Sequence, residues 1–247
     1  MALHFVVDAP LGAAVGDTVE IGGAEAHHAA AVRRVRSGEV VTVGDGAGVW
    51  LTAEVVTAEP KRVVVRVTGR DEIAAPRRRV VLVQALAKGD RDELAVQAAT
   101  ELGVDAVVPW QASRSVSRWS GPKADKGVQR WSSIVREAAK QAHRAWIPTV
   151  DEPTGTSGLV ALAAQLRMLV LEPTASARLS DLDIVADGEA AGDVALVVGP
   201  EGGIAPDELA ALETAGATLV RLGDTVLRTS TAGPAALALV NLRLGRW

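Results

Sequence analysis

The second part of the chain alternates between short apolar runs and segments of helical character. The apolar runs are VVLVQAL (80–86), DAVVPW (105–110), RMLVLEP (167–173), VALVVG (194–199) and ATLVRLG (217–223). Runs of this length, separated by helical segments, are typical of an α/β domain with a mostly parallel sheet. The first run is almost continuously apolar, so we expect helices on both faces of that sheet.

The helices expected between these strands begin and end at recognisable residues. The segment 90–103 carries acidic residues in its first turn and ends at a glycine. The segment 125–145 is long and ends before Pro148, because proline disfavours helix in the residue before it. Further helices are predicted over 206–216 and from about residue 231 onward.

The first 70 residues or so are predicted to be mainly β. The runs 40–45, 49–56 and 62–69 are rich in β-branched residues. The sequence GDGAG joins the first two of them and is a glycine-rich hairpin signal. One helix is expected over 24–34, followed by Gly38.

A domain border is expected at the polar, proline-containing segment 71–79. We therefore predict a small β-rich domain over residues 1–73 and the α/β domain over residues 74–247. Small β modules of this kind often bind RNA, but a fold alone does not assign a function.

Residue composition excludes several classes of chemistry. The chain of 247 residues has no cysteine, which excludes disulfides, thiolate catalysis and cysteine-ligated zinc. Four histidines without i, i+4 pairing do not favour a metal site. The N-terminal sequence lacks a basic leader, and no stretch approaches the ~18 apolar residues of a membrane helix. We therefore expect a cytoplasmic protein that binds no metal and no membrane.

Positive charge is concentrated in one part of an acidic chain. The formal net charge is −4, yet residues 111–147 carry eight basic and two acidic side chains. A positive block inside an acidic protein points to a polyanionic partner such as RNA. A solvated helix face explains such a block equally well.

Three loops follow predicted strands and carry the chemistry of the α/β domain. They are LEPTAS (171–176), GPEGG (199–203) and LGDTVLRTSTAG (222–233). In an open α/β sheet, ligands bind at the carboxyl ends of the strands. The three loops are therefore predicted to converge on one pocket.

The GPEGG loop favours a neutral or cationic ligand. It matches neither G-x-G-x-x-G nor a P-loop, and it has no lysine for a polyphosphate. Glycines allow close approach of backbone to a ligand or positive φ, and Pro200 fixes one bend. Glu201 adds a negative charge where a phosphate binder would avoid one. A tight turn that merely joins strand to helix is the alternative.

The third loop contains Arg228 among apolar and hydroxyl residues, where a purely solvated arginine is unexpected. It could contact a ligand, or it could form an ion pair with Glu201 or Glu172.

Taken together, VGPEGG and the later LG-x-x-x-LRTSTA resemble the RsmE family of 16S ribosomal RNA methyltransferases, in the SPOUT superfamily. The resemblance spans essentially the whole chain. Other segments follow in family order: His28 with Val32 and Arg34, then Gly38; Lys88-Gly89; Thr100 to Val104; Ser113-Arg114-Ser115; Arg130-Trp131; Glu137-Ala138 with Gln141; and Arg144 with Ile147-Pro148.

This resemblance implies a fold, a cofactor and a reaction. The fold is a PUA-like domain over 1–73 and a SPOUT methyltransferase domain over 74–247 with a C-terminal trefoil knot. The cofactor is S-adenosyl-L-methionine, and the partners are 16S rRNA in the small ribosomal subunit and a second copy of the chain. The reaction is methyl transfer to N3 of one uridine, which must be unpaired or flipped to be reached.

The resemblance also implies roles for particular residues. Arg228 is expected to stabilise the uridine anion, and either Glu201 or a water molecule is expected to accept the N3 proton. The implied cofactor contacts are Leu171, Glu172, Val198, Gly199, Pro200, Glu201, Gly202, Gly203, Leu222, Gly223, Val226, Leu227, Arg228 and Thr229. The implied RNA contacts are His28, Arg33, Arg34, Arg36, Arg114, Arg118, Lys123, Arg130, Arg136, Lys140 and Arg144.

Within the RNA set, Arg136, Lys140 and Arg144 are spaced at i, i+4 and are expected to share one helix face. His28 could instead be an ordinary residue of its helix face.

Two positions depart from the family pattern. Ser230 stands where the family usually has Glu, so no acid–base role is carried over to it. Ala205 stands where Ser or Thr often caps the following helix, at a typical cost of ~1 kcal/mol. The first departure leaves a non-catalytic ribosome-assembly factor as an alternative function. A nucleotide hydrolase is a third possibility, opposed by the missing P-loop lysine.

Overall fold

The computed structural model describes residues 2–184 and 192–247. The chain divides into two compact units. The first contains residues 1–76 and 139–147, and the second contains residues 77–138 and 148–247. The border at 73 and 74 remains a prediction, but the return of residues 139–147 to the first unit was not expected.

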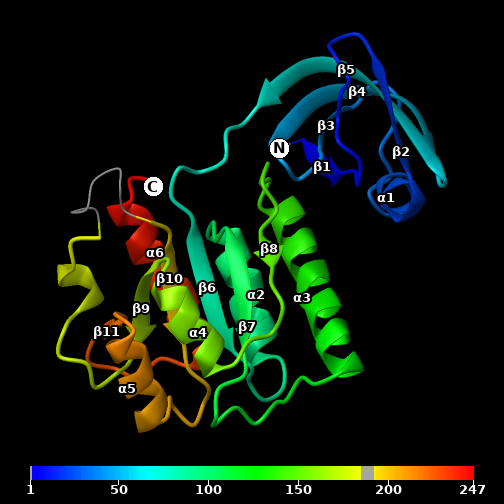
Figure 1. The fold of residues 1–247 in the computed structure, drawn as a ribbon. Coiled ribbons are helices and arrows are strands. Elements are labelled where there is room, and N and C mark those ends of the chain that lie inside the picture. Colours follow the sequence, from blue (N-terminus) through cyan, green and yellow to red (C-terminus); the bar gives the residue numbers. More distant parts are fainter. Residues whose placement is uncertain (1, 185–191) are drawn as a thin grey trace. The chain divides into compact units, whose positions relative to one another are not determined.

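The first unit is built on a five-stranded sheet with the order β1-β3-β4-β5-β2 (Figure 1). Its strands are β1 (Leu3–Val6), β2 (Thr18–Gly22), β3 (Val40–Gly44), β4 (Val49–Glu59) and β5 (Arg62–Glu72). The β1–β3 pair is parallel and the other pairs are antiparallel. The three predicted strands and the hairpin are confirmed, and alternate apolar residues of these strands form the core of this unit.

The predicted helix over 24–34 is present in two parts. Helix α1 (Gly23–His27) continues directly into a π-helical turn (His28–Val32). It ends where Arg34 takes a φ of +55°, a region that non-glycine residues seldom adopt.

Residues 139–147 contribute directly to the packing of the first unit. The Lys140 ammonium pairs with the Glu25 carboxylate at 2.9 Å, and the Trp146 indole donates to the Ile73 carbonyl at 2.7 Å. Helix α3 (Pro122–Gln141) ends four residues before the predicted end, and His143 beyond it has a φ of +53°. The prediction that Arg144 shares a helix face with Arg136 and Lys140 is therefore wrong, because α3 ends at Gln141.

The second unit contains a six-stranded sheet with the order β11-β9-β10-β6-β7-β8. Every pair in it is parallel. The strands are β6 (Val80–Ala85), β7 (Ala106–Trp110), β8 (Thr149–Val150), β9 (Arg167–Leu171), β10 (Val194–Val198) and β11 (Thr218–Val220). The predicted α/β class with a parallel sheet is confirmed, and only β8 was not foreseen.

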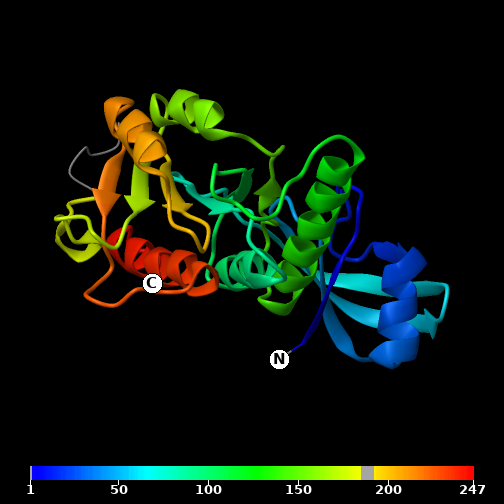
Figure 2. The same ribbon diagram turned by 90° about the horizontal axis from the view of Figure 1, so that it is seen from below.

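Helices cover both faces of this sheet, as the apolar first strand predicts. Figures 1 and 2 show α2 (Arg91–Glu101) and α6 (Thr229–Arg243) on one face, and α4 (Thr156–Ala163) and α5 (Pro206–Thr214) on the other. Alternate residues of β6 pack beneath α4 and α5. On the opposite face α6 approaches closely at Gly233, where a Cβ would lie 2.9 Å from Leu82.

The connection that follows β11 pairs with the connection that follows β9. The Arg221 N–H donates to the Ala177 carbonyl, and the Leu179 N–H donates to the Arg221 carbonyl, both at 2.9 Å. A short 3-10 helix (Leu179–Asp181) lies on this connection. Residues 185–191 of it lie outside the described ranges, and the trefoil knot remains a prediction from the resemblance.

Candidate active site

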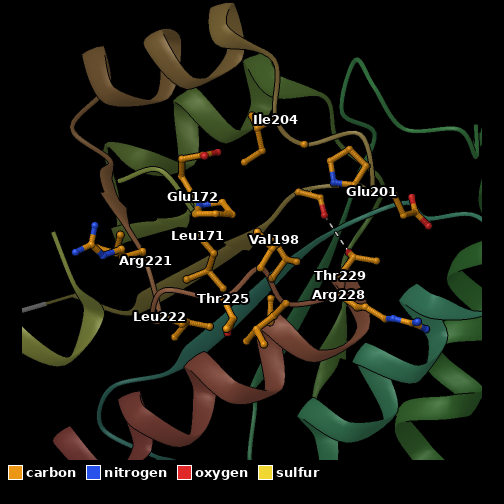
Figure 3. Close-up of a pocket in the computed structure, with 18 of the residues that line it drawn as sticks. Leu171, Glu172, Val198, Glu201, Ile204, Arg221, Leu222, Thr225, Arg228 and Thr229 are labelled. Atoms are coloured by element: carbon orange, nitrogen blue, oxygen red, sulfur yellow. Dashed lines mark hydrogen bonds between the residues drawn. The ribbon is translucent and has the colours of Figure 1, made fainter. Parts of the chain in front are cut away.

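The carboxyl ends of β9, β10 and β11 lie side by side and enclose a cavity of about 410 Å³ (Figure 3). Ligand pockets in proteins are roughly 300–1,000 Å³, so this cavity can hold a cofactor. Its lining comes from all three predicted loops, which confirms that they converge. Leu171, Val198 and Val220 line the cavity from the ends of the three strands.

Most of the residues expected to contact a cofactor line this cavity. They are Leu171, Glu172, Val198, Gly199, Pro200, Glu201, Gly203, Leu222, Gly223, Val226, Leu227, Arg228 and Thr229. Gly202 is the exception. Its carbonyl accepts from Arg114 Nη1 at 3.1 Å, and the Arg114 side chain covers its Cα.

Seven further residues complete the lining: Arg91, Pro173, Ile204, Val220, Arg221, Thr225 and Ala232. Three of them, Pro173, Thr225 and Ala232, lie within the predicted loops, and Ile204, Val220 and Arg221 lie directly beside these loops in the sequence. Arg91 comes from the first turn of α2, 110 residues before Glu201 in the sequence, and no motif identifies it.

The shape of the GPEGG loop depends on two of its glycines. Gly203 has a φ of +71°, and its N–H donates to the Pro200 carbonyl at 2.9 Å. A Cβ on Gly199 would lie 2.6 Å from Cγ1 of Ile204, closer than real Cβ contacts. The loop therefore requires glycine at one position for its conformation and at the other for space.

The Glu201 carboxylate accepts hydrogen bonds from two other residues of the protein. Its Oε1 accepts from Arg91 Nη1 at 2.9 Å and from the Lys88 N–H at 3.0 Å. Partial burial tends to raise the pKa of Glu201, but the hydrogen bonds from backbone N–H groups and from Arg91 outweigh burial and hold this pKa below its ordinary value. A carboxylate with a lowered pKa is a weak proton acceptor, which disfavours Glu201 as the general base.

Arg228 does not form the ion pair that was the alternative to ligand contact. Glu201 pairs with Arg91, and the Glu172 carboxylate accepts from the Thr174 hydroxyl and N–H. Arg228 is exposed, and within residues 2–184 and 192–247 no acceptor is bonded to its guanidinium. Its side chain points away from Leu171 and Leu222 (Figure 3).

Thr229 lines the cavity, but its hydroxyl is used within the protein. Thr229 Oγ1 donates to the Gly199 carbonyl at 2.9 Å, the dashed line in Figure 3. The same oxygen accepts from Gln84 Nε2 at 2.9 Å. The hydroxyl is therefore committed to Gly199 and Gln84. Gln84 was not predicted, although a polar residue within a buried strand is a visible signal in the sequence.

A buried carboxylate joins the loop after β7 to the start of α5. Glu208 accepts from the Ser113 N–H at 2.9 Å, the Ser113 hydroxyl at 2.8 Å, the Thr156 hydroxyl at 2.5 Å and the Ala205 N–H at 3.3 Å. Burial raises the pKa of Glu208, but these hydrogen bonds outweigh it and lower the pKa overall. Ala205 offers no capping side chain, as expected, and Glu208 supplies half of a capping box instead.

The residues expected to bind RNA differ in their solvent exposure and in their partners within the protein. Lys140 is 7% exposed and is paired with Glu25, so its expected role on an RNA-binding face is wrong. Arg130 pairs with Glu93 at 2.8 Å, and Arg118 donates to the Ser113 carbonyl. Exposed members are Arg33, Arg34, Arg36, Arg114, Arg118, Lys123 and Arg130, and partly exposed members are His28, Arg136 and Arg144.

Comparison with known families assigns both parts of the chain. Residues 74–241 match the RNA methyltransferase domain family, and residues 21–68 match the RNA methyltransferase PUA domain family. The first match covers more than half of the chain.

Individual relatives agree with this assignment. Ribosomal RNA small subunit methyltransferase E of Mycobacterium bovis is 47% identical over 237 residues, which cover 94% of this chain and 89% of the relative. The crystal structure of the protein of that name from Neisseria gonorrhoeae, bound to S-adenosyl methionine, is 29% identical, with a TM-score of 0.86 and 98% of each chain covered. A putative methyltransferase from Legionella pneumophila with bound cofactor SAM has a TM-score of 0.84, 27% identity and 98% coverage of each chain. The chain therefore belongs to the RsmE family of RNA methyltransferases, with a PUA domain and a methyltransferase domain.

Proposed function

We propose that this protein transfers a methyl group from S-adenosyl-L-methionine to N3 of one uridine in 16S rRNA. The observation that carries the proposal is the cavity at the ends of β9, β10 and β11, which has a partly apolar lining and an unpaired arginine at its edge among the described residues. The family supplies the prior expectation, since the relative from Neisseria gonorrhoeae was crystallised with this cofactor.

The cavity contains carboxylates that a cationic sulfonium tolerates. Glu172 and Glu201 line it together with Arg91, Arg221 and Arg228, and Arg91 is paired with Glu201. Backbone of the glycine loop offers hydrogen-bonding groups to a ligand without side-chain charge. The bound cofactor would supply an electrophilic methyl carbon beside the substrate base.

Arg228 is proposed to stabilise the negative charge that develops on the uracil. N3 of uracil is weakly acidic and must lose its proton to become a good nucleophile. A guanidinium directed at O2 or O4 would stabilise that anion, and such electrostatic contacts are worth roughly 10²–10³ in rate. Because Glu201 is bonded to Arg91 and Lys88, we assign it to shaping the cavity and leave proton removal to water.

RNA binding is proposed for the exposed basic residues of both units. In the second unit these include Arg114 and Arg118 on the segment after β7 and Lys123 at the start of α3, and in the first unit Arg33, Arg34 and Arg36. N3 lies on the Watson–Crick edge, so the target base must leave any pairing before it enters the cavity. The small ribosomal subunit is the proposed substrate, as the names of the relatives imply.

A homodimer in the cytoplasm is proposed for the working protein. Leu242 and Trp247, near the end of the chain, are 61% exposed each, and Val226 at the cavity is 79% exposed. Exposed apolar side chains of this size are candidates for a subunit interface. Within the described residues no helix is both long and apolar enough to cross a membrane.

The test compares rRNA nucleosides from cells with and without this gene by mass spectrometry. We expect one N3-methyluridine of 16S rRNA to disappear on deletion and to return on complementation. Full methylation in the deleted strain would refute the proposal. Loss of the gene without any change in methylation, but with defective small subunits, would favour the assembly-factor alternative raised by Ser230.

A further inference from the structure

Gln84 is a fully buried polar residue in the strand beside the cavity strands. All six residues of β6 are buried, and Gln84 is 0% exposed. A buried amide without partners destabilises a fold by roughly 1–3 kcal/mol. Here Nε2 donates to Thr229 Oγ1 at 2.9 Å and to the Ala85 carbonyl at 3.2 Å. The amide nitrogen is therefore satisfied by residues of two different elements.

The direction of these hydrogen bonds is fixed by elementary chemistry. The Gly199 carbonyl can only accept, so the single hydroxyl hydrogen of Thr229 must point to it. Thr229 Oγ1 then has only lone pairs left for Gln84, which must present its N–H. The donors therefore run from Gln84 Nε2 through the Thr229 hydroxyl to the Gly199 carbonyl, while Gln84 Oε1 is buried without a partner among the described residues.

This relay joins the two loops that carry the expected chemistry. Gly199 is the first residue of the GPEGG loop, and Thr229 begins α6 directly after Arg228. The Arg228 carbonyl also accepts from the Thr231 and Ala232 N–H groups, at 2.8 and 3.0 Å. The backbone of Arg228 is therefore held on its C-terminal side by the helix and by the relay.

We propose that Gln84 and Thr229 are positioning residues, which hold the Gly199 and Arg228 backbones in the geometry that methyl transfer requires. This inference rests on the proposed function. Thr229 acts through Arg228 and Gly199 and does not donate its hydroxyl to the cofactor. A displacement of about 1 Å at a reacting site can reduce the rate ~100-fold. The hydrogen bonds from Gln84 through Thr229 to Gly199 fix two loops and are therefore expected to affect kcat strongly.

The first test replaces the hydroxyl without changing shape. Thr229→Val keeps the branched side chain but removes both bonds, and Thr229→Ser keeps the hydroxyl. We expect kcat of Thr229→Val to fall roughly tenfold or more, and Thr229→Ser to stay within about threefold of the wild type. Thr231→Val, on the exposed side of the same turn, is the matched control and should leave kcat unchanged.

The second test asks whether Thr229 acts through Arg228. Arg228→Ala is measured alone and combined with Thr229→Val, in methyl transfer to small subunits. If positioning Arg228 is the role of Thr229, the double variant loses little more than Arg228→Ala alone. Losses that multiply in the double variant would overturn the inference, as would an unchanged kcat of Thr229→Val.

Two measurements separate this inference from the proposed function and from folding. Calorimetry of S-adenosyl-L-methionine with the wild type tests the cofactor itself, and a wild type that neither binds it nor methylates rRNA defeats the proposed function. Thermal unfolding shows whether Thr229→Val folds. Should it fail to fold, Gln84→Met removes only the first donor, and its kcat must fall while Thr231→Val stays at the wild-type value.

Discussion

The Glu208 carboxylate gives a prediction whose size follows from its contacts. Four donors from three segments surround it, and no cation is bonded to it among the described residues. Glu208→Gln keeps one acceptor oxygen and the side-chain volume. Its NH2 group replaces one of the two carboxylate oxygens, each of which accepts two of the four hydrogen bonds. Hydrogen bonds to a charged group are worth about 1.5–3 kcal/mol, so we expect a loss of about 3 kcal/mol in unfolding free energy.

The loss of unfolding free energy caused by Glu208→Gln is expected to depend on pH. The folded-state pKa of Glu208 lies below its ordinary value of 4.5. Between these two values the unfolded chain binds more protons, so the carboxylate stabilises the fold above about pH 4.5 and this contribution is lost as pH falls through the folded pKa. The difference between wild type and Glu208→Gln is therefore largest at neutral pH and shrinks in acid.

Guanidinium unfolding at several pH values between 3.5 and 7 measures both effects. Thermal melting at pH 7 should fall by roughly 6–12 °C for ~3 kcal/mol in a chain of this size. Glu213→Gln on the exposed side of the same helix is the matched control and should change little. A Glu208→Gln variant as stable as the control, or a difference that does not vary with pH, would refute this account of the carboxylate.

Three further predictions concern other parts of the chain. Lys140→Met leaves the Glu25 charge buried without its partner and should lower unfolding free energy by about 3–5 kcal/mol, with chemical denaturation as the assay. Burial, with the nearby charges of His143 and Lys140, lowers the pKa of His4 from 6.5 to about 4, so its imidazole resonances should titrate near pH 4, and its contribution to stability should fall as pH drops from 6.5 to 4. A midpoint near 6.5 would contradict that. Gly199→Ala places a methyl 2.6 Å from Ile204 and should weaken cofactor binding in calorimetry at least tenfold, whereas Gly155→Ala, at a negative φ with no atom within 4 Å of the added Cβ, should not.

The second unit could be predicted well because its signals are local. Each of the five predicted strands lies within a short apolar run, and acidic or glycine residues mark the ends of several helices. The loops could be placed together before any coordinates, since parallel strands end at the same edge of a sheet. Strand β8 has two residues and carries no pattern, whereas β1 and β2 were missed although β2 alternates between exposed and buried residues.

What the sequence could not provide was pairing between distant residues. Lys140 and Glu25 are 115 positions apart, and only the structure shows that the helix end returns to the first unit. For the same reason Lys140 was read as a surface cation, and Arg91 was not recognised at the cavity. Gln84, by contrast, could have been found from the sequence. It is the single polar residue in the apolar run VVLVQA, and a buried amide needs a hydrogen-bond partner.

Methyl transfer in vitro is the direct test of the proposed reaction. Purified protein is incubated with S-adenosyl-L-methionine and small subunits from cells that lack the gene, and the rRNA nucleosides are resolved by mass spectrometry. We expect one N3-methyluridine per 16S rRNA with the wild type, and a rate reduced roughly 100-fold with Arg228→Ala while cofactor affinity is retained. Methylation of another atom, no methylation, or an Arg228→Ala enzyme as fast as the wild type would contradict it.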